Sequence, residues 1–372
     1  MRLTVEQVDG RARLREFIRL PRQLYGGMAG YIPPLDAERR ELIDPKKSPF
    51  FSHGQAAYWI ARRDGRAVGR ISAQIDDVEG PDTPPGFGMF GCLDAIDDRE
   101  VVALLLHTAE TWLRERGRHT IRGPFILSIN GESGMLIDGQ TRAPMILMPW
   151  HPEYLHRHVA AAGYRTAMRL FSFELDLSKI TDDELSHKNS APQNFTARDM
   201  RLSDFQTEME IARSIYNDGW QRNWGFVPGT TADTEGLARS FKPLLIEEMA
   251  LFACDRNEPV GFALTLPNLF DVTADLGASP GLFGWLKLAW RLRRQRYRSF
   301  RLVFIGGRQV RHHSGLGEFL LRETVRRVRR YGGEKLTCSW ILESNVAFIS
   351  LLQRFHFSAG ATYGVFEKEI LP

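Results

Sequence analysis

Apolar residues recur with two different periods along the chain, and their order predicts strands and helices. Residues 56–62 and 67–75 are apolar runs separated by Asp64-Gly65, a pair that is typical of a tight hairpin turn. Residues 86–93 add a third run, and residues 102–112 are then apolar at helical spacing. The first part of the chain therefore predicts three strands, a helix and a further strand.

A similar succession returns in the second part of the chain. Residues 249–253 and 260–266 predict another hairpin, and residues 302–305 form the short apolar run of a buried strand. A helical stripe follows and stops at Gly332-Gly333. Residues 334–341 then predict the next strand.

This repeat predicts an α/β fold with mixed sheets, arranged as two tandem domains. We place the first domain at residues 1–177 and the second at residues 195–372. Residues 178–194 are polar and are expected to link them. The second domain carries an insertion, residues 281–298, in which aromatic and aliphatic residues stand beside clustered arginines.

A glycine-containing loop separates the strand at 302–305 from the helix that follows it. Gly315 and Gly317 let a ligand approach the backbone closely, and the unpaired N–H groups of a first helical turn attract phosphate. The same pattern also occurs in ordinary turns. The loop alone therefore leaves a phosphate site and a simple turn as alternatives.

The loop resembles the pyrophosphate loop of the GNAT superfamily of N-acyltransferases, whose pattern is Gln/Arg-x-x-Gly-x-Gly/Ala. His312 stands at the first position, where Gln or Arg is usual, and Gly315 and Gly317 match the fourth and sixth. The resemblance implies acyl-CoA or acetyl-CoA as co-substrate. It also implies a set of CoA-binding residues: Val310, Arg311, His312, His313, Ser314, Gly315, Leu316, Gly317 and Asn345.

The end of the chain follows the usual GNAT ending only in part. Asn345, Leu351 and Phe357 match that ending, but Leu352 stands where many GNAT enzymes have the tyrosine that protonates the departing CoA sulfur. Tyr216 and Tyr363 are candidates to replace it. In the first domain the corresponding loop, residues 94–98, is acidic and lacks Gly-x-Gly, so we expect CoA to bind only the second domain.

The whole chain resembles a bacterial family of tandem GNAT-like proteins, some of which look like bacterial ceramide synthases. The resemblance rests on Gly123-Pro124…Ser128-x-Asn130-x-Glu132-x-Gly134, on residues 223–228 (NWGFVP) and on the glycine loop. It implies transfer of an acyl group from acyl-CoA to a primary amine, with a long-chain, sphingoid-type lipid amine as one acceptor that fits.

The polar loops supply the remaining candidate residues. Loops of this polarity are often functional, although structural turns and core packing are the plain alternatives. The catalytic candidates are Asn130, Glu132, Asp138, Tyr216 and His313. The candidates for binding the substrate are Asn223, Trp224 and Phe226.

The composition of the chain indicates which class of protein it belongs to. Apolar residues make up 43% of the chain and charged residues 25%, which is typical of a soluble globular protein. The three cysteines show neither metal nor disulfide spacing, and no stretch is long and apolar enough to span a membrane. We expect a cytoplasmic protein without metal and without nucleic acid.

Two alternatives remain open. The insertion at 281–298 has the composition of a helix that lies on an anionic membrane surface, but a helix that packs on its own domain has a similar pattern. The rival to an enzyme is a catalytically degenerate GNAT pair that binds acyl-CoA or a lipid surface and acts as a regulatory module. Leu352 and His312 favour this rival.

Overall fold

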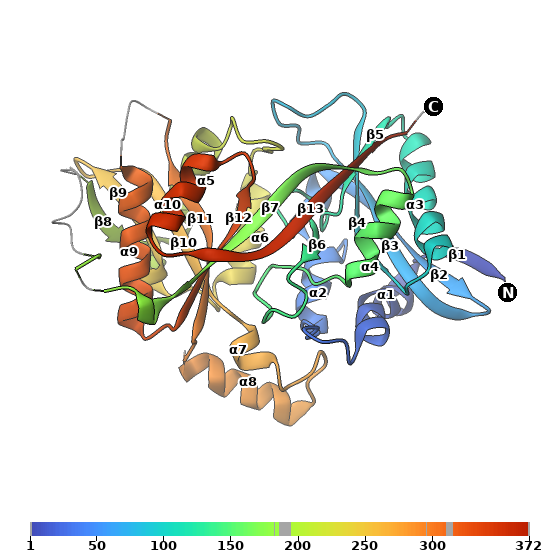
Figure 1. The fold of residues 1–372 in the computed structure, drawn as a ribbon, viewed down its shortest axis with the longest axis horizontal. Helices are drawn as coiled ribbons and strands as arrows, with labels where there is room; N and C mark the ends of the chain where they lie inside the picture. The colour runs from blue at the N-terminus through green and yellow to red at the C-terminus, as the bar shows by residue number, and fades with distance from the viewer. Residues whose placement is uncertain (1, 182, 186–194, 295, 310–314, 371–372) are drawn as a thin grey trace. The chain divides into compact units, whose positions relative to one another are not determined.

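The computed structural model describes residues 2–181, 183–185, 195–294, 296–309 and 315–370. They form two compact units, each with a mixed α/β architecture (Figure 1). Unit 1 comprises Met1–Leu170, Ala274–Gly281 and Ala361–Pro372, and unit 2 comprises Phe171–Thr273 and Leu282–Gly360. Two short segments from the second half of the chain thus belong to unit 1.

Unit 1 is built on a sheet whose strand order is β1-β2-β3-β4-β5-β13, with β6 also paired to β13. Neighbouring strands are antiparallel except for β4 and β5, which are parallel. The strands are β1 Leu3–Gln7, β2 Gly54–Arg63, β3 Arg66–Asp76, β4 Phe87–Ala95, β5 Thr120–Gly123, β6 Met135–Asp138 and the end of β13 Ser358–Glu369.

Helices cover both faces of the unit 1 sheet, as the alternation along β2 shows. Ala57, Trp59 and Ala61 pack in one cluster with α3. Tyr58 and Ile60 point to the other face and pack with Phe17 of α1. Period-two alternation in a strand buried on both sides produces this division. The helices are α1 Gly10–Tyr25, α2 Asp36–Ile43, α3 Arg99–Arg114 and α4 Glu153–Ala161.

Unit 2 repeats the plan with the strand order β7-β12-β11-β10-β9-β8. β11 and β12 are the parallel pair, and β8 to β11 are antiparallel. The strands are β7 Arg165–Asp176 (from Phe171), β8 Phe195–Asp199, β9 Ala250–Asp255, β10 Glu258–Pro267, β11 Ser299–Gly307 and β12 Lys335–Leu342. The helices are α5 Phe205–Gly219, α6 Thr231–Phe241, α7 Phe270–Thr273, α8 Leu282–Arg294, α9 Leu316–Tyr331 and α10 Val346–Arg354.

Most predicted elements are present, with shifts that have physical causes. Gly332 ends α9 as expected, in the left-handed conformation with φ of 95°. The helix of the insertion covers Leu282–Arg294, and Tyr297 beyond it is buried and packs against Phe300. The sequence analysis missed α6, whose apolar residues are too few to show a helical stripe.

In each unit one helix connects the two parallel strands: α3 between β4 and β5, and α9 between β11 and β12. The two units can therefore be compared at equivalent positions. In the part of the chain that the structure describes, no helix combines the length and the apolar character needed to cross a bilayer.

The last strand is fixed into unit 1 by a nearly buried ion pair. β13 pairs with β5 through Phe366 opposite Gly123, and Arg122 Nε donates to the Glu367 carboxylate at 2.8 Å. The Arg122 and Glu367 side chains are only 10% and 13% exposed. An ion pair this far from solvent leaves an uncompensated charge if one partner is removed.

We therefore expect Glu367→Gln to lower the free energy of unfolding by about 3 kcal/mol. Glu153→Gln is the matched control, because Glu153 and Arg157 are 66% and 60% exposed and form an ordinary surface pair. That control should cost less than about 1 kcal/mol. Urea unfolding measures both, and equal losses in the two variants would contradict the anchoring role of Glu367.

Candidate active site

The parallel strands of unit 2 part after a short paired stretch. β11 pairs with β12 from Ser299 to Leu302, opposite Lys335 to Cys338, and the described parts of the two strands then continue without pairing to each other. At the point of parting, Arg301 Nε donates to Ser339 Oγ at 2.9 Å. Beyond Leu302, β11 remains paired to β10, so its edge towards β12 is left open.

The helix that follows this open edge begins at a glycine. Gly315 is the N-cap of α9 with φ of 90°, a left-handed conformation that favours glycine, and it has no side chain to cap the helix. At Gly317 an added Cβ would meet only Leu351, at 3.9 Å. The described chain therefore gives no packing reason for a glycine at 317, whereas a ligand lying against the backbone would give one.

Leu316, between the two glycines, is a core residue. It is buried, and its side chain fills the space above Gly261 and Gly307, which pair across β10 and β11. Leu316 is one of the predicted CoA-binding residues. Because its side chain is buried, only its backbone is available to a ligand. Val310, Arg311, His312, His313 and Ser314 lie outside the described residues.

The chain that enters the glycine loop is held at two points. Arg308 donates its backbone N–H to the Val260 carbonyl at 2.8 Å. Gln309 donates its backbone N–H to the Asp218 carboxylate at 2.7 Å. Asp218 lies near the end of α5, so this helix fixes the position from which the loop starts.

Leu316 covers one face of β10 and β11, and an aromatic cluster covers the other face. Trp220 stacks on Phe304 with ring centroids 4.4 Å apart, and Tyr216 contacts both rings. A side chain at Gly306 would overlap the Trp220 ring, which is why β11 has a glycine there. The cluster therefore packs on β11, the strand whose edge towards β12 is not paired beyond Leu302.

The predicted substrate-binding residues belong to this cluster or adjoin it. Phe226 is buried against Tyr216, with ring centroids 5.4 Å apart. Asn223 contributes to the local turn through its backbone, accepting from Phe226 and donating to Trp220. Trp224 is half-buried. Core packing thus explains the presence of Phe226 without a substrate. Trp224, by contrast, is partly exposed.

Tyr216 stays protonated at neutral pH. Burial, with a smaller contribution from Asp233, raises the pKa of Tyr216 well above its usual value. Its hydroxyl donates to the Val227 carbonyl at 3.2 Å. The other candidate acid, Tyr363, is buried on β13 in unit 1, where it pairs with Leu136 of β6.

The end of the GNAT-like pattern has a structural role. Asn345 caps α10, its side chain accepting the N–H of Phe348 at 3.2 Å. Leu352 is completely buried, so the position of the usual tyrosine is part of the core in this protein.

In unit 1 the equivalent opening is filled by the chain itself. β4 and β5 pair from Phe87 to Met89, and Phe125, which follows β5, then donates its N–H to the Phe90 carbonyl at 2.9 Å. The Phe125 side chain is buried. Side chains at Gly91 or Gly123 would overlap backbone atoms of Phe125 or Phe90, so both glycines allow this close crossing.

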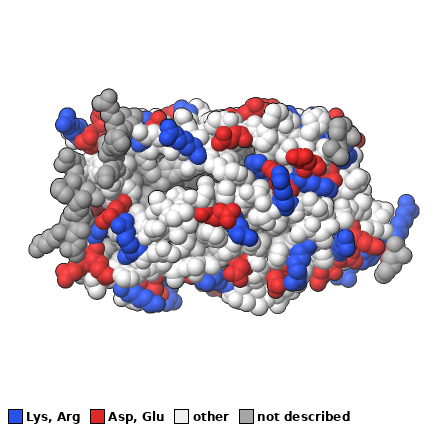
Figure 2. Space-filling model, turned by 45° about the horizontal axis from the view of Figure 1, so that its top comes forward, with Lys and Arg blue, Asp and Glu red and all other residues white. Residues whose placement is uncertain are grey.

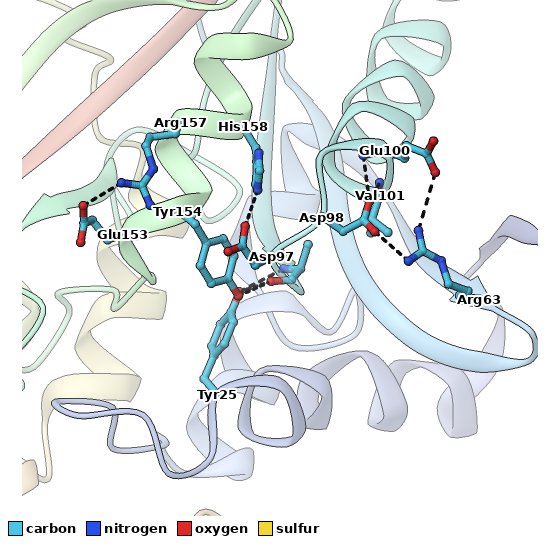
Figure 3. A network of polar contacts seen from close by, with 11 residues as sticks. Tyr25, Arg63, Asp97, Asp98, Glu100, Val101, Glu153, Tyr154, Arg157 and His158 are labelled. Atoms are coloured by element: carbon cyan, nitrogen blue, oxygen red, sulfur yellow. Dashed lines mark hydrogen bonds and ion pairs between the residues drawn. The ribbon is translucent and has the colours of Figure 1, made fainter. Parts of the chain in front are cut away.

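The end of β4 is closed by two tyrosines (Figure 3). Tyr154 donates its hydroxyl to the Ala95 carbonyl at 2.8 Å, and the Ala95 N–H donates to the Tyr25 hydroxyl at 3.0 Å. Both polar groups of Ala95 are therefore satisfied within unit 1.

The helix that follows β4 is capped by its own carboxylate. Asp98 accepts the N–H groups of Glu100 and Val101 and also pairs with Arg63, while Asp97 contacts His158 at 2.7 Å (Figure 3). The acidic residues expected to repel a pyrophosphate are thus individually paired. The N-terminus of this helix is thus capped by a side chain of unit 1.

The polar loop of unit 1 centres on one buried ion pair. Glu132 is buried, and its two carboxylate oxygens accept from Arg39 of α2 at 2.8 and 2.5 Å. Burial alone would lower the pKa of Arg39, but Glu132 and Glu38 outweigh it and raise that pKa. Asn130 and Asp138, the other candidates, are exposed.

Two residues of this region were missed from the sequence. Arg39 lies far from Glu132 along the chain, and arginines on a polar helix give no sign of a distant partner. His151 is buried, and burial lowers the pKa of its ring. Its Nδ1 accepts the N–H of Leu136 at 3.2 Å, as a neutral imidazole does. Among the described residues, no group of three or more His, Cys, Asp and Glu side chains is arranged to hold a metal ion.

Known proteins resemble the chain over its whole length, although no family model matches it. The bacterial ceramide synthase of Caulobacter vibrioides is 35% identical over 377 residues, covering 99% of this chain and 98% of that protein. Protein YghO of Escherichia coli K12 is 35% identical over 363 residues, covering 96% and 93%.

A solved structure gives the same fold. The tandem GNAT protein from the clavulanic acid biosynthesis pathway has a TM-score of 0.61 and 13% identity, and the match covers 100% of this chain and 99% of that one. The sequence relatives and this shared fold confirm the resemblance inferred from the glycine loop and the polar motifs. The chain belongs to the tandem GNAT-fold N-acyltransferase family.

Proposed function

We propose that the protein transfers an acyl group from a CoA thioester to a primary amine, and that CoA binds unit 2 alone. The observation that carries this proposal is the contrast between the two parallel strand pairs. Among the described residues, β11 and β12 do not pair beyond Leu302 and the N-cap of α9 is a glycine, whereas Phe125 bonds to β4 and Asp98 caps α3 in unit 1.

The start of α9 suits the CoA pyrophosphate. The first N–H groups of a helix lack internal partners, and the helix dipole adds positive potential at that end. Gly317 leaves room for an anion against the first turn. The pantetheine arm would lie between β11 and β12, where it can form the hydrogen bonds that the strands do not make with each other.

The reaction is attack of a neutral amine on the thioester carbonyl, giving an amide and the free CoA thiol. A backbone N–H at the open edge of β11 would polarise the carbonyl oxygen. Among the candidate proton acceptors, Asp138 is an exposed carboxylate, Glu132 shares both oxygens with Arg39, and His313 lies outside the described residues. We assign Glu132 to holding the polar loop in place.

Tyr216 is the proposed proton donor to the CoA sulfur. It belongs to unit 2 and packs with Trp220 on β11. General acid catalysis of this kind typically contributes two to four orders of magnitude in rate, about 10²–10⁴. Tyr363, the other candidate, belongs to unit 1.

A long-chain, sphingoid-type amine is the acceptor class that we favour. The relative from Caulobacter vibrioides carries the name bacterial ceramide synthase and matches nearly the whole chain. The aromatic cluster around Trp220 and the exposed part of Trp224 would offer apolar contact to a lipid acceptor.

The second candidate is a module that binds acyl-CoA without catalysis. Complete burial of Leu352 at the usual tyrosine position favours it. Release of CoA thiol from acyl-CoA in the presence of long-chain amines decides between the two, because only an enzyme produces it at more than one equivalent per protein.

Gly317→Leu should weaken CoA binding without weakening the fold. Leucine is a better helix former than glycine by roughly 0.5–1 kcal/mol, and its Cβ has space. We expect at least about a tenfold loss of affinity for CoA by calorimetry, or ~1.4 kcal/mol. Gly281→Leu is the control, since Gly281 also has open space around it. Unchanged CoA affinity in Gly317→Leu would remove α9 from the binding site.

Tyr216→Phe should slow acyl transfer while preserving the ring contacts. We expect kcat to fall by at least about tenfold and the affinity for CoA to stay within about twofold. Since the pKa of Tyr216 is raised, its acid form persists to alkaline pH, and this residue should add no alkaline decline to the wild-type rate. Tyr331→Phe, also in unit 2, is the control. A normal kcat in Tyr216→Phe would refute the assignment.

A further inference from the structure

Helix α8 presents its apolar residues to solvent. Leu282 and Phe283 are 74% and 84% exposed, and Leu286 and Trp290 are 59% and 53% exposed. A helix on a globular protein normally buries its apolar stripe. These four side chains therefore do not cover the core of the domain, although the opposite side of α8 packs on it.

The orientation of α8 is fixed from its other side. Leu288 is its one buried residue, and Arg291 donates to the Val272 carbonyl of α7 at 2.8 Å. Figure 1 shows α8 beside α7, away from the strands of the unit 2 sheet. Leu282, Leu286 and Trp290 follow one another at four-residue spacing, so they form one outward stripe.

Cations flank this stripe and continue past its end. Lys287, Arg293 and Arg294 are exposed, and Arg294 lies over the Trp290 ring at 4.2 Å. Residues 281–298 contain no Asp or Glu. On the face drawn in Figure 2, by contrast, basic and acidic side chains are interspersed, as expected for a net charge of +4.

We propose that α8 docks the protein on an anionic lipid surface. An exposed stripe of Leu, Phe and Trp inserts at the boundary between head groups and acyl chains, and the flanking cations attract anionic head groups. A second copy of the same helix would be a poorer partner, because it would bring two acid-free basic segments together. This proposal does not depend on the acyl-transfer reaction.

The cations and the apolar side chains of α8 should contribute to lipid binding in different ways. Each Lys or Arg near an anionic surface strengthens binding roughly fivefold, and salt screens this attraction. The apolar side chains supply attraction that salt does not screen. Binding to a lipid surface therefore requires both the cations and the apolar side chains. Binding to a soluble polyanion requires the cations alone.

Co-sedimentation of the full chain with vesicles tests the proposal. The protein should bind phosphatidylcholine vesicles containing phosphatidylglycerol more tightly than pure phosphatidylcholine vesicles, and less tightly as salt rises. The triple variant Lys287→Gln, Arg293→Gln and Arg294→Gln should lose on the order of 100-fold in affinity for the anionic vesicles. Arg11→Gln, Arg15→Gln and Arg330→Gln remove the same charge from exposed sites elsewhere and serve as the control.

The apolar stripe is tested separately with Leu282→Ser, Phe283→Ser and Leu286→Ser, with Met28→Ser as the control. We expect at least a tenfold loss from the stripe variant and none from the control. Vesicle binding that survives loss of the stripe but requires the cations would identify a polyanion partner and overturn the proposal. Equal binding to both vesicle types, or a change of oligomeric state in the stripe variant without a change in vesicle binding, would also overturn it.

Discussion

Where two parallel strands part, the exposed backbone of the strand and the start of the connecting helix must find other partners. Unit 1 supplies them from its own chain: Phe125 bonds to β4, and Asp98 caps α3. Unit 2 leaves β11 open beyond Leu302 and starts α9 at Gly315. The two units thus share one architecture, and among the described residues they differ in which groups satisfy the backbone where the parallel strands part.

The closed unit still carries the polar loop. Both oxygens of the buried Glu132 carboxylate accept from Arg39, and a bidentate pair of this kind fixes the relative position of the two side chains. This contact ties the loop between β5 and β6 to α2. The last strand is joined to β5 through Arg122 and Glu367 and also pairs with β6, so it contacts the strands at both ends of that loop.

The sequence was sufficient for the elements with strong patterns and for the family, but not for long-range partners. Asp64-Gly65 and Gly332 marked turns correctly, since these residues suit conformations that others avoid. The ion pair of Arg39 with Glu132 and the place of β13 in unit 1 depend on tertiary packing, which local periodicity does not encode. The outward face of α8 was equally hidden, because an amphipathic stripe has the same pattern whether it faces a core or solvent.

Amide hydrogen exchange of the full chain, with and without CoA, tests the central claim most directly, because it reports which backbone groups the ligand protects. The account predicts slower exchange at residues 303–309 and in the first turn of α9, with no change at residues 90–101. Protection at residues 90–101 without protection in β11 and α9 would place CoA in unit 1 and contradict the account.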